Sequence, residues 1–119
     1  MRMNSSMNFD IRASSYFATE AKRLSKHYPS FKNDYDNFIK SLKEDPYQGD
    51  DLGNGVRKVR MPIASKGRGK SGGARVITLN FLIDEQNMEI NLLLLYDKKN
   101  ADNFNPAALK EALKELGLI

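Results

Sequence analysis

The lysines and arginines of this chain are its best candidates for chemistry, because they are concentrated in one stretch. The 32 residues from Leu52 to Ile83 contain seven basic side chains and no aspartate or glutamate. The seven are Arg57, Lys58, Arg60, Lys66, Arg68, Lys70 and Arg75. The whole chain has 19 basic and 15 acidic residues, so the residues outside this stretch include 12 basic and all 15 acidic side chains. A concentrated cationic surface attracts a polyanion through counterion release, which makes RNA the first candidate partner.

The same stretch contains a Gly-Lys-Ser triplet ending at Ser71, which raises the question of a phosphate-binding P-loop. The first glycine of that motif would fall at position 64, which is Ala64, and no crossover helix pattern follows. The match therefore fails. A charged loop that is only solvated is the usual meaning of such a run, so the charge pattern alone leaves this reading and RNA binding open.

Length and composition limit the class of protein. The 119 residues are enough for a single domain covering 1–119. The absence of cysteine excludes thiolate catalysis, disulfides and a cysteine-based zinc site, and it is compatible with a reducing cytoplasm. The longest apolar run, Leu92 to Tyr96, is far shorter than the roughly 20 residues that cross a bilayer. We expect a cytoplasmic protein with no membrane partner, no metal and no cofactor.

Apolar periodicity predicts two helices in the first half of the chain. The first runs from about Ser15 to His27 and ends at Tyr28-Pro29, because a residue before proline disfavours the α region. The second follows Ser30, a plausible N-cap, and stops at Asp45-Pro46. The two should form a helical hairpin.

The second half of the chain predicts strands and one more helix. Alternation and apolar runs predict strands over Val56–Ile63, Ala74–Ile83 and Met88–Tyr96, the last at a central position buried on both faces. Residues 49–55 and 84–87 have turn composition, and the glycine-rich residues 64–73 predict a mobile loop. A final helix should begin at Asn105-Pro106 and end at Gly117. Residues 8–12 give a weak signal for an edge strand.

These elements predict an α+β fold in the order (β)ααβββα, with two N-terminal helices, a C-terminal helix and a small antiparallel sheet. We expect the helices on one face of the sheet and the other face open. Within the first predicted strand, Lys58 and Arg60 alternate with Val59 and Met61, so the two cations should project from the open face. That face and the adjoining loop would share the cationic patch.

Three sequence segments in order resemble the RelE/HigB superfamily of toxins from bacterial toxin–antitoxin modules. They are Gly55–Arg60 (GVRKVR), Gly67–Ile77 (GRGKSGGARVI) and Leu94–Lys99 (LLYDKK), followed by Asn105–Leu109 (NPAAL). The similarity is closest to the HigB-like branch and covers about residues 31 to 119. The resemblance implies the fold predicted above, a ribosome-dependent endoribonuclease that cuts messenger RNA and so inhibits translation, and a cognate antitoxin protein that neutralises it.

The resemblance also suggests site residues. Arg75 matches the arginine that the family places on the scissile phosphate, although an interstrand salt bridge is its structural alternative. Tyr96 could stack on a base or donate a proton, or be an ordinary core tyrosine. Asp97 could orient a neighbour. The candidate catalytic residues are Lys58, Arg60, Arg75, Tyr96 and Lys98, and the candidate RNA-binding residues are Arg57, Lys66, Arg68, Lys70 and Lys99.

RNA cleavage by a 2′-hydroxyl needs a proton acceptor, cations for the developing phosphorane charge and an acid for the 5′-oxygen. The only histidine, His27, stands at the end of a predicted helix, and we interpret it as a surface or cap residue. Lysines must then replace the usual histidine pair. Crowding of Lys58 and Arg60 with the loop cations disfavours each positive charge, which favours a neutral lysine as the base.

The chain departs from the family pattern at its C-terminal end. Some members carry a tyrosine there, whereas the region after Lys99 offers only Phe104, which has no hydroxyl. Tyr96 is a possible substitute. Two alternatives stay open: a gyrase poison of the related ParE branch, which does not need the cleavage residues, and a module that binds RNA or an acidic protein without catalysis.

Overall fold

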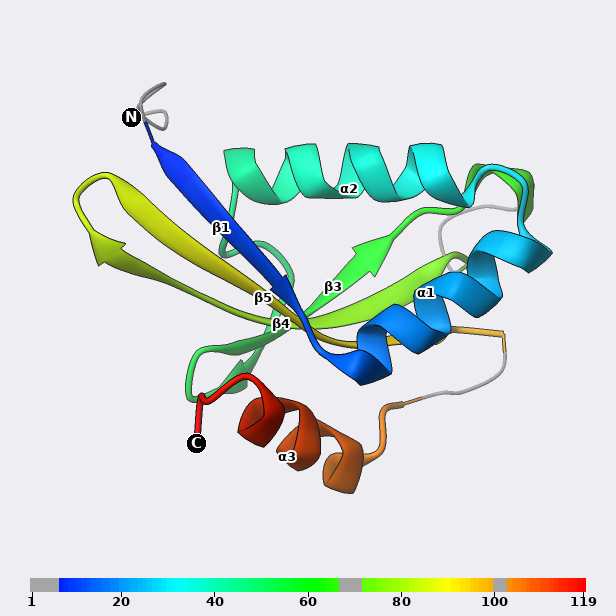
Figure 1. Ribbon diagram of the computed structural model, residues 1–119. Helices are drawn as coiled ribbons and strands as arrows, with labels where there is room; N and C mark the ends of the chain where they lie inside the picture. The colour runs from blue at the N-terminus through cyan, green and yellow to red at the C-terminus, as the bar shows by residue number, and fades with distance from the viewer. Residues whose placement is uncertain (1–6, 67–71, 100–102) are drawn as a thin grey trace.

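The structure, a computed structural model, describes residues 7–66, 72–99 and 103–119 of the chain. Its elements follow the order β1, α1, α2, β2, β3, η1, β4, β5 and α3, which confirms the α+β class (Figure 1). The helices are α1 (Ser15–His27), α2 (Phe31–Glu44) and α3 (Pro106–Glu115), with a 3-10 turn η1 (Ala64–Lys66). The strands are β1 (Asn8–Ala13), β2 (Asp50–Gly53), β3 (Val56–Met61), β4 (Ala74–Asp84) and β5 (Asn87–Asp97).

The strands form one mixed sheet in the order β1-β5-β4-β3-β2. Three neighbouring pairs are antiparallel, but β1 runs parallel to β5, from Asn8 opposite Asn87 to Ala13 opposite Leu92. The prediction of an antiparallel sheet is therefore wrong at this edge. Whether β5 runs parallel or antiparallel to β1 depends on the path of the six elements between them, and local periodicity carries no information about that path.

The strand β2 lies inside residues 49–55, where the sequence predicts only a turn. Its Asp50 and Asp51 pair with Lys58 and Arg57 of β3, and opposite charges placed directly across two strands stabilise the pairing. Asn54, at the tip of the hairpin, has a positive φ of 56°. The aspartates and glycines weaken the local strand signal, so the pairing with β3 decides the conformation.

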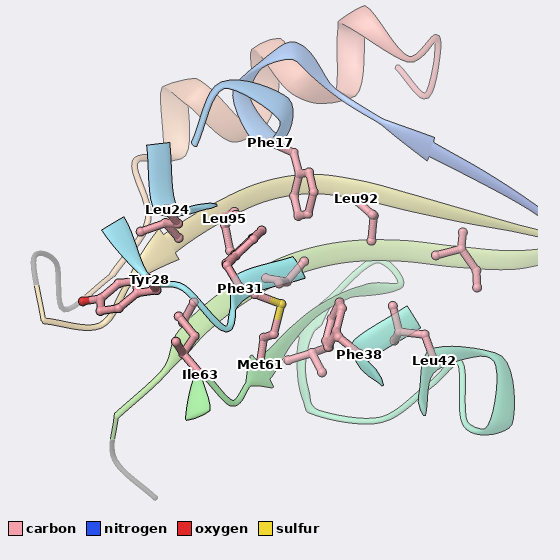
Figure 2. Close-up of a cluster of buried hydrophobic side chains, with 14 of the residues drawn as sticks. Phe17, Leu24, Tyr28, Phe31, Phe38, Leu42, Met61, Ile63, Leu92 and Leu95 are labelled. Atoms are coloured by element: carbon pink, nitrogen blue, oxygen red, sulfur yellow. The ribbon is translucent and has the colours of Figure 1, made fainter. Parts of the chain in front are cut away.

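One face of the sheet, here called the α1/α2 face, carries the larger core. Figure 2 shows Phe17, Phe31 and Phe38 from the two helices reaching toward Met61, Leu92 and Leu95 of the strands. Each of these six side chains is buried. The predicted helical hairpin therefore exists because its apolar stripe has this sheet face to cover.

The opposite face is covered in part by α3, so the prediction that all helices share one face and leave the other open is wrong. Ala112 of α3 and Leu116 directly after it pack with Ile77, Leu93 and Tyr96 of the strands in a second core. Figure 1 shows α2 above the sheet and α3 below it. We call this second surface the α3 face. An amphipathic pattern gives the helix an apolar side but does not say which sheet face receives it.

A bulge in β5 explains why its leucine run is buried on both faces. Ile77 of β4 pairs with Leu94 and Thr78 pairs with Leu92, which leaves Leu93 without a partner. Leu93 and Leu94 both belong to the α3-face core, whereas Leu92 belongs to the other core. The strand lies between β1 and β4, so the predicted central position is confirmed.

None of the helices in the described part of the chain has the length and apolar character that crossing a bilayer requires.

Candidate functional site

Three of the predicted catalytic residues lie in one row across the sheet. Arg60 at the end of β3 is directly opposite Arg75 at the start of β4, and Arg75 is directly opposite Tyr96 near the end of β5. Residues paired across strands project from the same sheet face. Tyr96 packs in the α3-face core, so the row belongs to that face. We call Arg60, Arg75 and Tyr96 the arginine row.

Lys58 belongs to the neighbouring row on the same face. It pairs with Ile77, which in turn pairs with Leu94. Lys58 is half-buried, and its ammonium forms no ion pair with any carboxylate that the structure describes. The prediction that Lys58 and Arg60 project away from Val59 and Met61 agrees with the burial of those two apolar side chains in the opposite core.

A glycine fixes the position of Arg75 beside Arg60. Gly73 has a φ of +75°, and a Cβ at this position would lie 2.6 Å from the carbonyl oxygen of Met61. Only glycine allows this close approach of the two backbones without strain. The guanidinium of Arg75 donates through Nη1 to the carbonyl oxygens of Gly72, at 3.1 Å, and Ala74, at 3.2 Å.

The pairing of Arg60 with Arg75 sets two like charges directly opposite each other. Such a cross-strand pair is destabilising by itself. Arg60 is exposed and lies beyond the last residue pair between β3 and β2, whereas Arg75 is half-buried. An anion bound between the two guanidiniums would offset their repulsion, and a phosphate group suits the planar donors of arginine.

Tyr96 supplies a neutral hydroxyl at the inner end of the row. The residue is only 9 % exposed, and its hydroxyl has no hydrogen-bond partner among the described residues. Burial raises the pKa of Tyr96, while the positive charge of Arg75 acts in the opposite direction. The phenol is therefore protonated at neutral pH, and it can donate a proton but not accept one as a phenolate.

Tyr96 also borders a hollow of about 580 Å³ between the starts of α1 and α3. Phe104 borders the same hollow together with Tyr16 and Thr19. The chain thus brings a second aromatic ring, without a hydroxyl, to the region of Tyr96. Phe104 and Tyr96, the two aromatic residues considered in the sequence analysis, thus line the same hollow.

Lys66 has a different environment from Lys58 and Arg75. Its ammonium lies 2.7 Å from Oδ1 of Asp97, and the side chains are 11 % and 1 % exposed. Oδ2 of Asp97 accepts from the hydroxyl of Tyr28 at 2.8 Å, and Oδ1 accepts from the backbone N–H of Lys99 at 2.9 Å. We call this arrangement the Asp97 network. The predicted RNA contact by Lys66 would compete with a buried ion pair.

The Asp97 network perturbs both of its acidic groups. Burial by itself would raise the pKa of Asp97, but the hydrogen bonds from Lys66, the Lys99 backbone and Tyr28 hold it below its ordinary value. Burial, followed by the hydrogen bond to Asp97, raises the pKa of Tyr28. At neutral pH Asp97 is therefore a carboxylate and Tyr28 a neutral phenol.

Three further predicted cations, Arg57, Lys98 and Lys99, are not members of the arginine row. Arg57 donates to the carbonyl oxygens of Gln48 and Gly49, at 3.2 and 3.1 Å, and belongs to the set of β3 residues that alternates with Lys58. Lys98 and Lys99 form the turn after β5. Arg68 and Lys70 lie outside the described residues. The structure thus groups Lys58 with the arginine row and separates Arg57 and Lys66 from it.

No sequence motif indicates the role of Tyr28. Its hydroxyl reaches Asp97 across 69 residues of chain, whereas the local pattern predicts only that Tyr28 ends a helix before proline. The sequence predicts that Asp97 orients a neighbour. In the structure its carboxylate accepts hydrogen bonds from the Tyr28 hydroxyl, the Lys66 side chain and the Lys99 backbone. A buried aspartate directly after an apolar strand is the one local sign of such a network, because a buried charge needs partners.

No family model matches this chain. No curated protein matches it either. Within the described residues, no group of three or more histidine, cysteine, aspartate or glutamate side chains is arranged to hold a metal ion.

Proposed function

We propose that this chain is a cytoplasmic toxin of the RelE/HigB kind, which cleaves messenger RNA on the ribosome and so inhibits translation. The observation that carries the proposal is the arginine row with Lys58 beside it. Two guanidiniums, one lysine amine and one protonated phenol share a sheet face. These are the groups that 2′-hydroxyl attack on a phosphodiester requires when histidine is absent from the site.

The proposed reaction begins with Lys58. In its neutral form Lys58 accepts the proton of the 2′-hydroxyl, and the 2′-oxygen forms a bond to the adjacent phosphorus. Arg75 and Arg60 donate hydrogen bonds to the non-bridging oxygens, where negative charge increases in the transition state. The two positive charges, which repel each other in the free protein, would both be attracted to the negatively charged phosphorane.

The reaction ends with the bond from phosphorus to the 5′-oxygen breaking. The leaving oxygen takes a proton from Tyr96 or from the ammonium of Lys98, which gives a 2′,3′-cyclic phosphate and a 5′-hydroxyl. The raised pKa of Tyr96 keeps its proton in place until that step. No metal takes part in the proposed steps.

Dependence on the ribosome follows from the weakness of the acid–base groups. A lysine and a buried tyrosine are less suited to proton transfer near pH 7 than a histidine pair, so orientation of the strand must supply more of the rate. We therefore expect weak activity on free RNA. We also expect a cognate antitoxin whose acidic segment competes with RNA for the cations.

The test is induced expression in a bacterial host of the wild type, Arg75→Ala and the control Lys40→Ala, which changes an exposed residue of α2. Growth is followed, and the 5′ ends of cellular messenger RNA are mapped. We expect growth arrest and new 5′ ends inside translated frames for the wild type and the control. Both should be lost in Arg75→Ala, with circular dichroism showing that the variant is folded.

The other outcomes identify the alternatives. Growth arrest with intact messages and broken DNA would move the case to a ParE-like gyrase poison. No arrest by a folded wild type that still binds RNA would leave the non-catalytic RNA-binding module.

A further inference from the structure

A second cationic feature lies at the same end of the sheet as the arginine row. It is a hollow of about 620 Å³ lined by His27, Tyr28, Ser65, Lys66, Gly72, Lys98 and Lys99. These residues come from the end of α1, from η1, from the entry to β4 and from the turn after β5. Figure 1 shows the end of α1 and η1 near one another at this end of the sheet. We call it the basic hollow.

The Asp97 network neutralises one of the cations of the basic hollow. Lys66 is paired with Asp97, and its ammonium also donates to the carbonyl oxygen of Gly73 at 3.2 Å. The same ammonium lies 5.6 Å from the centre of the Tyr28 ring. These contacts use the donors of Lys66 within the protein, so Lys66 shapes the hollow and contributes little net charge to it.

The rim of the basic hollow keeps its positive charge. Lys98 and Lys99 form no ion pair with a carboxylate in the described ranges, and no acidic residue lines the hollow. The imidazole of His27 is exposed and stands edge-on to the Tyr28 ring, with centroids 4.6 Å apart. The hollow therefore offers two ammonium groups and an imidazole to an anion.

The basic hollow is connected to the arginine row through the backbone. Gly72 lines the hollow, and its carbonyl oxygen accepts from the guanidinium of Arg75 at 3.1 Å. On β5, Lys98 follows Tyr96 by two residues. An RNA strand that places one phosphate on Arg75 thus meets a second cationic surface, the basic hollow, at the adjoining end of the sheet.

We propose that the basic hollow binds a neighbouring phosphate of the single-stranded RNA whose scissile phosphate lies on Arg75. This inference rests on the proposed function and adds His27 to the residues that contact the substrate. Single-stranded RNA is favoured over an acidic protein segment because phosphates repeat along its backbone, and the two cationic features are linked in the way a continuous polyanion requires. Contacts in the hollow position the strand without reading its bases.

The test is equilibrium binding of a labelled oligoribonucleotide with 2′-O-methyl groups, which cannot be cleaved. Wild type, Lys99→Gln, His27→Gln and the control Lys40→Gln are compared by fluorescence anisotropy over a range of salt concentrations. One phosphate contact to a single strand releases roughly 0.7 counterion, so Lys99→Gln should weaken binding about fivefold at 0.1 M salt and lower the salt slope accordingly. His27→Gln should weaken binding by about twofold or more, and Lys40→Gln should not.

Three results would overturn the inference. They are unchanged RNA binding in both hollow variants, an equal loss of RNA binding in the control, or hollow variants that bind an acidic peptide more weakly while their RNA binding is intact.

Inorganic phosphate is tested as a competitor. Displacement of the oligoribonucleotide by millimolar phosphate in the wild type but not in the hollow variants would support a phosphate site in the hollow, and displacement that is equal in all variants would count against it. Cleavage is assayed separately, so hollow-dependent binding without cleavage removes the proposed function alone, and cleavage with unchanged binding in the variants removes this inference alone.

Discussion

The arginine row and the Asp97 network stand at the same end of one sheet and use similar residues in opposite ways. In the network, a lysine lies on a buried carboxylate that also accepts from Tyr28 and a backbone N–H. In the row, two arginines oppose each other and a tyrosine hydroxyl has no partner in the described part of the chain. The donors of the first arrangement lie on a buried carboxylate, whereas the second is the site to which the proposed mechanism assigns the substrate phosphate.

The two arrangements differ in whether a buried carboxylate lies against the lysine. Lys58 and Lys66 are both half-buried lysines of the basic stretch, but only Lys66 lies beside Asp97. Removing an internal partner should therefore lower stability in the network. Removing a residue of the row should lower activity and leave stability nearly unchanged. The predictions below test this contrast.

The largest effect should come from Asp97→Ala. The substitution leaves the ammonium of Lys66 partly buried without its carboxylate, and breaking a buried ion pair in this way costs about 3–5 kcal/mol of unfolding free energy. Urea unfolding monitored by circular dichroism measures the loss. Asp36→Ala, on the exposed side of α2, is the matched control and should change stability by less than about 0.5 kcal/mol. A cost below about 1 kcal/mol for Asp97→Ala would contradict a stabilising network.

Arg75→Ala should give the converse result. Among the described residues, its side chain donates to two carbonyl oxygens near its own position in the chain, so the unfolding free energy should change by about 1 kcal/mol or less. Loss of a group that stabilises the transition state should slow messenger cleavage on purified ribosomes about 100- to 1000-fold. Single-turnover cleavage rates measure this effect. Equal cleavage by Arg75→Ala and the wild type would remove the arginine row from the proposed mechanism.

The two buried tyrosines allow the same substitution on each side of the comparison. Tyr28→Phe removes a hydrogen bond to a charged carboxylate and should cost about 1.5–3 kcal/mol of unfolding free energy. Tyr96→Phe removes a buried hydroxyl without a partner, so stability should stay equal or rise slightly. If Tyr96 donates the proton, its cleavage rate should fall about 100-fold. Urea unfolding and cleavage of both variants are measured side by side, and equal stability losses would show that the two hydroxyls do not differ as described.

The smallest effect should be a pH dependence confined to the network. The pKa of Asp97 is lower in the folded protein than its ordinary value of about 3.9, so its contribution to stability is present above that value. It should be lost as the pH falls through the folded pKa. The difference in unfolding free energy between the wild type and Asp97→Asn should therefore shrink from pH 7 toward pH 3. A difference that stays constant over this range would mean that Asp97 is not the titrating group.

Several local elements were predictable because their signals are local. The first helix ends at His27 as predicted, since Tyr28-Pro29 cannot continue it. The last helix has Asn105 as its N-cap, with the side chain accepting from the N–H of Ala107, and Gly117 follows it with a φ of +74°. These features depend on a few adjacent residues, which the sequence contains in full.

The errors in the fold concern relations between distant elements. The parallel pairing of β1 with β5, the short strand β2 and the position of α3 on the second face each depend on contacts between separate parts of the chain. Both sheet faces carry apolar side chains on which α3 could pack. Hydrophobic burial is not directional, so the pattern cannot choose between them.

The candidate site was predictable as a set of residue types but not as a geometry. Alternation in β3 placed Lys58 and Arg60 on one face, and the motif resemblance singled out Arg75 and Tyr96. The pairing of Arg75 with both Arg60 and Tyr96 needed the registers of two strand pairs. Register follows from side chains on neighbouring strands and from the Gly73 approach, neither of which is visible in one strand alone.

The sequence by itself determined where helices begin and end, which strand positions are apolar and where positive charge is concentrated, because these depend on residue types and spacing over a few residues. Tertiary structure alone decided that Lys66 is paired with a buried carboxylate. Asp97 lies 31 residues from Lys66 and 69 from Tyr28, and only the packing of α1, η1 and β5 brings the three together. A buried charge must have partners, and its partners are chosen in space.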